Sequence, residues 1–129
     1  MDAGKRVRRD RSLEVEPLDN GTFAFTARLT DRSYGGSYEP TADSAVIHDF
    51  VVTGEVGGDD LRITRLTVDA PTHPYAQCPA VLPTCEELVG SALGSGWRST
   101  VLERLRGRAG CTHVTSLLLS LTELTTLTF

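Results

Sequence analysis

The stretch that decides the fold, residues 12–30, reads SLEVEPLDNGTFAFTARLT. Its first part alternates Leu13 and Val15 with glutamates, which is the period-two pattern of a half-buried strand. After the turn, phenylalanine, alanine and leucine alternate with polar residues, so the second strand also has one apolar face. Between the strands lies Asp19-Asn20-Gly21, whose Asn and Gly tolerate positive φ. The stretch therefore predicts an antiparallel β-hairpin.

Two more strands are predicted beyond a loop over residues 33–43, which contains two glycines and a proline. The first is the long apolar run 45–53, which Gly57-Gly58-Asp59-Asp60 turns back. The second, residues 61–69, has apolar positions that change register midway, which predicts a β-bulge near Thr64 or Arg65. Together with the hairpin, these segments predict an antiparallel sheet of about four strands.

The second half of the chain has the periodicity of helices, after a proline-rich connector over residues 71–83. Residues 84–87 read TCEE, a capping box that predicts a short helix. Trp97, Val101 and Leu105 recur at helical spacing, and a last helix is expected from Thr112 almost to Phe129. Strands followed by helices predict an α+β fold with about three helices packed on one face of the sheet. Its most buried residues are expected to include Leu117, Leu118, Leu121, Trp97, Phe23, Phe25 and Phe50.

The charge of the chain is divided unevenly. The net charge of −4 consists of +3 on residues 1–11 and −7 on the remaining 118 residues. We interpret residues 1–11 as a basic, flexible leader and residues 12–129 as a single domain. A leader that touches phosphates is the alternative, but nucleic-acid binders normally carry a basic face on the folded body, so no nucleic-acid partner is expected.

Composition also bounds the setting of the protein. No apolar run approaches the roughly 18 residues of a membrane span, and no secretory signal is visible. Three cysteines without a C-x-x-C motif do not make a disulfide framework. We therefore expect a cytoplasmic protein without membrane contact, and the sequence leaves self-association open.

His48 and Asp49 are the first candidate functional residues, because they lie within an apolar strand. Ionisable groups in such a strand are costly to bury unless they are paired. Neighbouring residues in a strand point to opposite faces, so only one of the two is expected to face the helices unless a bulge redirects the other. That residue could act as an acid or base in a pocket, or could be a structural polar group.

The second candidate segment is Gly110-Cys111-Thr112-His113 at the predicted start of the last helix. Thr112 is a natural N-cap, which would place Cys111 and His113 at the partially positive helix end. This position lowers a thiol pKa and favours a neutral imidazole. A nucleophile, a general base or an anion site could be built here, or Cys111 could be a small buried residue and His113 a surface residue.

The third segment, residues 73–79, reads HPYAQCP and predicts a stiff loop that could hold Tyr75 and Cys78 in place. These motifs, with the residues 88–97 and the Gly-Cys-Thr-His helix start, resemble the bacterial family called domain of unknown function 2889. The resemblance implies functional residues at His48, Asp49, Tyr75, Cys78, Cys111 and His113. The chain departs from the family pattern at Ala76, where Pro is usual, and at Val114, where Leu is usual.

The best interpretation of these candidates is a cofactor-independent small-molecule enzyme that uses acid/base or thiol chemistry, such as an isomerase, cyclase or hydrolase. Its site is expected in a pocket between the sheet and the start of the last helix, where His48 or Asp49 would face His113. His48, Asp49, Cys111 and His113 would be catalytic. Substrate-binding side chains would be Tyr75, Cys78, Thr112 and Trp97. The alternatives are a non-catalytic ligand-binding or accessory protein, and a metal site built from Cys78, Cys111 and His113. No metal is expected, since these spacings are irregular.

Overall fold

A computed structural model describes residues 6–34, 44–72, 85–105 and 112–128. Four strands form one antiparallel sheet in the order β1-β2-β3-β4, so each strand pairs with its neighbour in the chain. The strands are β1 (Arg6–Pro17), β2 (Thr22–Tyr34), β3 (Ser44–Gly57) and β4 (Arg62–Thr72). The predicted sheet is confirmed, and the helices that follow it make the fold α+β.

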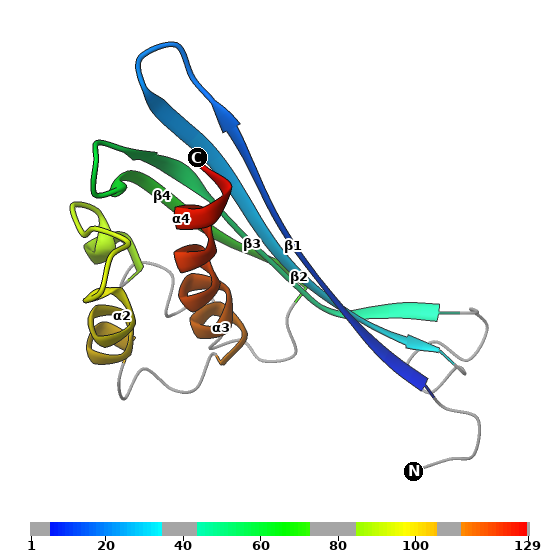
Figure 1. The fold of residues 1–129 in the computed structure, drawn as a ribbon. Coiled ribbons are helices and arrows are strands. Elements are labelled where there is room, and N and C mark those ends of the chain that lie inside the picture. Colours follow the sequence, from blue (N-terminus) through cyan, green and yellow to red (C-terminus); the bar gives the residue numbers. More distant parts are fainter. Residues whose placement is uncertain (1–5, 35–43, 73–84, 106–111, 129) are drawn as a thin grey trace.

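The helical elements lie on one side of the sheet, as Figure 1 shows. They are the 3₁₀ turn η2 (Glu86–Leu88), the helices α2 (Trp97–Leu105) and α3 (Thr112–Ser120), the 3₁₀ turn η3 (Leu121–Glu123) and the short helix α4 (Leu124–Leu127). The apolar stripe predicted for the last helix is buried throughout, at Val114, Leu117, Leu118, Leu121 and Leu124.

The helix count differs from the prediction at two places. The first predicted helix is only the 3₁₀ turn η2, whose cap residue Cys85 makes no side-chain cap hydrogen bond, while the predicted cap Thr84 lies outside the described residues. The last helix is interrupted by η3. There, the Ser120 and Thr122 hydroxyls donate to carbonyls three residues back, which competes with regular helical hydrogen bonds.

The β1–β2 hairpin is longer than predicted, and this changes the expected leader. Gly21 has φ of +79°, and the Leu18 amide donates to the Thr22 carbonyl at 2.8 Å, so the predicted turn is confirmed. The pairing then continues without interruption from Pro17 opposite Phe23 to Arg6 opposite Tyr34. Residues 6–11, which we expected in a flexible leader, are therefore part of strand β1.

Three register shifts alter the phase of the sheet. Glu55 pairs with Arg65 and Val56 with Ile63, so Thr64 is the extra residue, as the register change in the sequence predicted. The other two shifts were not predicted. One lies between β3 and β4, where Asp49 pairs with Thr72 and Val51 with Asp69, and the other lies between β2 and β3. Asp31 pairs with His48 while Arg32 pairs with Val46, so Ile47 has no partner on β2. The bulge at Ile47 lies directly beside the candidate residue His48.

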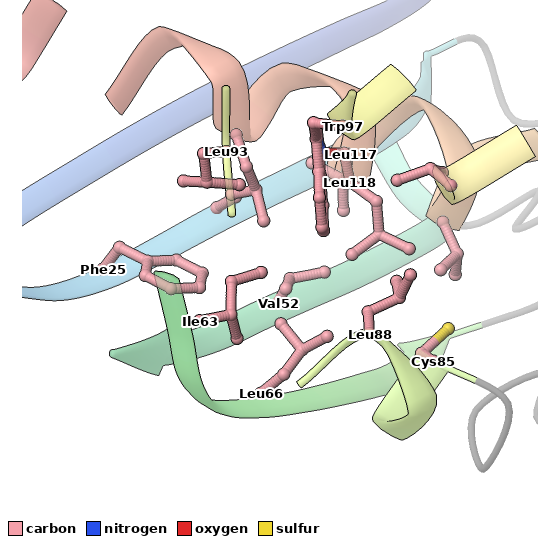
Figure 2. Packing of buried hydrophobic residues seen from close by; sticks show 14 of the residues in the cluster. Phe25, Val52, Ile63, Leu66, Cys85, Leu88, Leu93, Trp97, Leu117 and Leu118 are labelled. Carbon is pink, nitrogen blue, oxygen red and sulfur yellow. The ribbon is translucent and has the colours of Figure 1, made fainter. Parts of the chain in front are cut away.

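A single hydrophobic core lies between the sheet and the helices (Figure 2). Six of the seven residues that we expected in the core are at most 2% exposed, but Phe23 is only partly buried because it lies beside the hairpin turn. Trp97 is fully buried, and its Nε1–H donates to the Leu118 carbonyl at 2.7 Å, which ties α2 to α3. The core is therefore anchored by these two helices.

The two edges of the sheet differ. The outer side of β4 pairs with residues 90–93, since the Ile63 amide donates to Ser91 and the Leu93 amide donates to Leu61. Among the described residues, no segment pairs with the outer side of β1. In this part of the chain, no helix is long and apolar enough to span a membrane.

Replacing Leu118 with alanine should lower the free energy of unfolding by about 2–5 kcal/mol, because the side chain is fully buried and its removal leaves a cavity. Chemical denaturation followed by circular dichroism measures this value. Leu127→Ala, at a side chain whose residue is 50% exposed, is the control and should cost much less. Equal losses in the two variants would contradict the assigned core face.

Candidate active site

The core face of β2 changes from apolar to polar along the strand. Phe25, Ala27 and Leu29 lie on this face, and the same alternation places Asp31 and Ser33 next, both at most 3% exposed. Asp31 lies directly opposite Arg9 on β1 and directly opposite His48 on β3. Directly opposed residues on one face are within side-chain reach. The sheet therefore places a guanidinium, a carboxylate and an imidazole in one cross-strand row.

Arg9 and Asp31 form a two-point ion pair. Arg9 Nε donates to Asp31 Oδ1 at 2.7 Å and Nη2 donates to Oδ2 at 2.8 Å. The Asp31 side chain is 5% exposed, whereas that of Arg9 is 46% exposed. Only the carboxylate of the pair is therefore shielded from solvent. The hydrogen bonds from Arg9 lower the pKa of Asp31 from 3.8 to about 2, against the opposing effect of burial, with a smaller lowering from His48. Asp31 is therefore ionised at neutral pH.

His48 is held by the same carboxylate. Its Nδ1 lies 2.8 Å from Asp31 Oδ2, and an ionised carboxylate can only accept, so Nδ1 carries the proton. Neutral His48 then has its lone pair on Nε2. A carboxylate that fixes the tautomer and orientation of an imidazole is the arrangement that prepares histidine for proton transfer.

His113 approaches this row from the first turn of α3. Its ring stacks on Phe50 with centroids 5.0 Å apart and planes 5° apart, and its centroid lies 4.3 Å from that of His48. His113 Nε2 is 3.7 Å from Asp31 Oδ2, which is within ion-pair distance. Burial lowers the pKa of His113 from 6.5. The positive charge that His48 carries when it is protonated and the charge of Arg9 lower it further, while Asp31 opposes this effect. His113 is therefore neutral at physiological pH.

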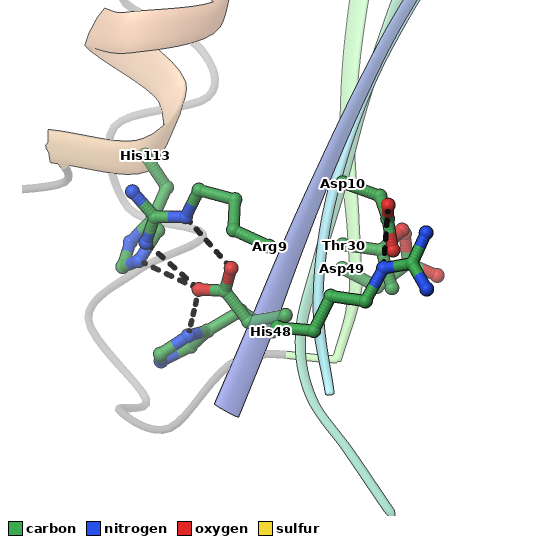
Figure 3. Close-up of polar contacts among 8 residues, drawn as sticks. Arg9, Asp10, Thr30, His48, Asp49 and His113 are labelled. Atoms are coloured by element: carbon green, nitrogen blue, oxygen red, sulfur yellow. Dashed lines mark hydrogen bonds and ion pairs between the residues drawn. The ribbon is translucent and has the colours of Figure 1, made fainter. Parts of the chain in front are cut away.

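Asp49 lies on the other face of the sheet, away from this group (Figure 3). Its carboxylate accepts from Arg28 Nε at 2.9 Å and from Arg28 Nη2 at 2.6 Å, and Thr30 Oγ1 is 3.4 Å away. The prediction that a strand residue would face His113 holds for His48. It is wrong for Asp49, because the strand alternation turns Asp49 away.

The remaining predicted residues are distributed differently. Thr112 is the first residue of α3 and is exposed. Trp97 is a core residue between α2 and α3, so the structure does not bring it to the cluster. The predicted residues Tyr75, Cys78 and Cys111 lie outside the described residues.

Arg9 and Asp31 are the members of the site that sequence reasoning missed. Both follow from the hairpin that the sequence does predict. Extending the alternation of β2 by one step places Asp31 on the core face, and counting back from the turn places Arg9 opposite it. The predicted strand ended at Thr30, one residue before Asp31, whereas β2 continues to Tyr34.

The cluster also has the composition of a metal site. Asp31, His48 and His113 each offer a ligand atom, and these atoms lie within 4.8 Å of one another. One carboxylate and two imidazoles suit divalent zinc or iron. In the metal set predicted from the sequence, His113 is the one member within the described residues.

Comparison with known proteins identifies the family. The model of a protein family of unknown function, DUF2889, matches residues 7–126. The chain belongs to this family. The match includes Arg9, Asp31, His48 and His113, so the whole cluster lies within the family region. No curated protein and no solved structure matches the chain.

The lowered pKa of Asp31 predicts a specific acid dependence of stability. A carboxyl whose folded pKa is below its unfolded value stabilises the fold above the unfolded pKa, and this contribution is lost as pH falls from 3.8 towards 2. The free energies of unfolding of the wild type and of Asp31→Asn should therefore converge over this interval. Asp10→Asn, at a side chain 57% exposed, is the control. Parallel profiles for wild type and Asp31→Asn would contradict the assignment.

Proposed function

We propose that this protein is a small-molecule enzyme that works by acid/base chemistry at the cluster of Arg9, Asp31, His48 and His113. The observation that carries the proposal is the position of His48, which is bound to a buried, ionised carboxylate and lies against a second, neutral imidazole. Such a pair can transfer protons to and from the substrate of an isomerase, cyclase or hydrolase.

His48 takes the role of general base in this proposal. With the proton fixed on Nδ1, the lone pair on Nε2 is the atom that accepts a proton from the substrate. Asp31 then stabilises the imidazolium that forms, and Arg9 keeps Asp31 ionised throughout. Arg9 and Asp31 are therefore positioning residues.

His113 supplies the second proton-transfer group. Because its pKa is lowered, it is neutral before the reaction and can either donate its N–H to an oxygen that becomes negative or accept a proton in turn. The side chains of His48 and His113 are 20% and 19% exposed, so water and a small molecule reach them only from a limited direction. This limited access suits a compact substrate.

Ser33 gives a separate reason to expect a ligand here. Within the described part of the chain, its Oγ is the one buried side-chain polar atom that has no hydrogen-bond partner. An unsatisfied buried hydroxyl costs about 1–3 kcal/mol. Ser33 follows Asp31 by one alternation on the same face of β2, so a polar atom of a bound substrate could satisfy it.

Exchange of carbon-bound hydrogen in deuterated water tests the proposal without knowledge of the full reaction. The protein is incubated with a panel of small compounds whose C–H is acidified by a neighbouring carbonyl, and NMR follows the loss of that hydrogen. At least one compound should exchange faster with the protein. His48→Gln and His113→Gln should slow this exchange by about 100- to 10,000-fold.

Asp49→Asn is the matched control, because Asp49 follows His48 in the chain but lies on the opposite face. It should retain the exchange rate. Thermal unfolding of each variant shows whether a loss of exchange follows from a loss of fold. Exchange that is abolished by Asp49→Asn and retained by His48→Gln would contradict the proposed site, and binding of a compound without exchange would favour a ligand-binding protein.

A metal centre at the same residues is the second candidate, because Asp31, His48 and His113 present three suitable ligand atoms together. The contact from Arg9 ranks it second. Arg9 Nη2 already donates to Asp31 Oδ2, the oxygen nearest both histidines, and places a positive charge where a cation would bind.

We predict that the purified protein carries no stoichiometric transition metal, which elemental analysis by mass spectrometry measures. Addition of zinc should also change the unfolding temperature of the wild type no more than it changes that of His113→Gln. Close to one equivalent of zinc or iron in the wild type, lost in His113→Gln, would replace acid/base chemistry with metal chemistry at this site. Asp49→Asn again serves as the control for a non-specific loss.

A further inference from the structure

The free edge of the sheet is long and regular. All twelve residues of β1 pair with β2 without a register shift. The proline of the strand, Pro17, lies at its end and does not interrupt it. Natural proteins usually protect such an edge with a bulge, an internal proline, a covering segment or charged side chains, and in the described part of the chain β1 has only the charges. The opposite edge is covered in this way by residues 90–93, and among the described residues β1 has no such cover.

The charges along β1 are arranged with opposite sign at its two ends. On the face of the sheet opposite the core, the first half carries Arg6, Arg8 and Asp10, whose carboxylate accepts from Arg8 Nε at 3.0 Å, and the second half carries Glu14 and Glu16. These residues are exposed. When two copies of such a strand run antiparallel, the basic half of each meets the acidic half of the other.

One register makes these pairs directly opposed. With the twofold axis at Arg11, Arg6 of one copy faces Glu16 of the other and Arg8 faces Glu14, and symmetry repeats both pairs. On the core face, Val7 faces Val15 in the same register, and Val7 is 52% exposed in the single chain. Within the chain Arg8 lies opposite Arg32, so a glutamate on its other side places an acidic charge in a basic row.

From this arrangement we propose that two copies of the chain associate through their β1 strands to form one continuous eight-stranded sheet. The occupant of the free edge is a second copy because the charge pattern is complementary to itself. The backbone amides and carbonyls on the outer side of β1 then pair as in any antiparallel ladder. The helices of both copies lie on the same face, since the register joins residues of the same face.

The same register contains one unfavourable contact. Arg11 faces Arg11 of the second copy at the twofold axis, and like charges directly opposite destabilise a strand pair. Replacing Arg11 with threonine should therefore strengthen the dimer. A dimer that uses another surface would not respond in this way.

Sedimentation velocity of the full chain over a range of concentrations tests the proposal. Wild type should show a reversible dimer. Arg8→Glu and Glu14→Arg should each raise the dissociation constant of the dimer by about tenfold or more, because each substitution turns two symmetric attractions into repulsions. The double variant with both substitutions restores the opposite charges and should restore the dimer.

The matched controls are Arg104→Glu and Glu103→Arg, which make the same charge changes at exposed positions of α2. They should leave the dissociation constant unchanged. Amide hydrogen exchange should become slower in β1 as the dimer forms. The proposal is overturned if the wild type is monomeric at all concentrations, or if a dimer forms but neither charge reversal at β1 weakens it.

Discussion

A carboxylate cannot remain ionised inside a protein without partners, and Asp31 is ionised while only 3% exposed. Its two oxygens are satisfied by Arg9 and His48, which the strand register places on either side of it. If either neighbouring strand slipped by one residue, these partners would turn to the other face and leave a buried charge. The Arg9–Asp31–His48 row therefore fixes the register of three strands as well as the geometry of the candidate site.

The pleat of the sheet separates two groups of similar composition. On the core face, Asp31 holds His48 beside the start of α3. There the His48 ring is partly buried and lies against the imidazole of His113. On the other face, Asp49 pairs with Arg28, whose side chain is 52% exposed. The Asp49 side chain is 10% exposed and so is almost as buried as that of Asp31, but its further contact is the Thr30 hydroxyl and not an imidazole. The difference between the two acids comes from the face on which each one lies.

Most of the fold could be predicted from the sequence, because alternation, turn residues and helical spacing are local signals. The four strands, the Asp19-Asn20-Gly21 turn, the Thr64 bulge and the buried helix stripe all follow from them. The helix breaks near Ser120 depend on hydroxyl hydrogen bonds that periodicity does not contain.

The candidate site could be predicted only in part. His48 and His113 were recognised because ionisable residues in apolar or capping positions are unusual locally. Asp31 and Arg9 are ordinary residues of a polar segment, and only the hairpin register makes them part of the site. The face on which His48 lies depends on the bulge at Ile47, and no local sequence pattern predicts that bulge.

That bulge has a consequence for how the chain tolerates changes of length. Counted from Ala45, regular alternation would turn Asp49 towards the helices, but the extra residue at Ile47 resets the count, so that His48 faces them instead. An insertion or deletion of one residue on the Ala45 side can therefore be absorbed by adding or removing a bulge, while the residues from His48 onwards keep their faces. Because of the bulge, the length of β3 on the Ala45 side can change while His48 stays on the face of the candidate site.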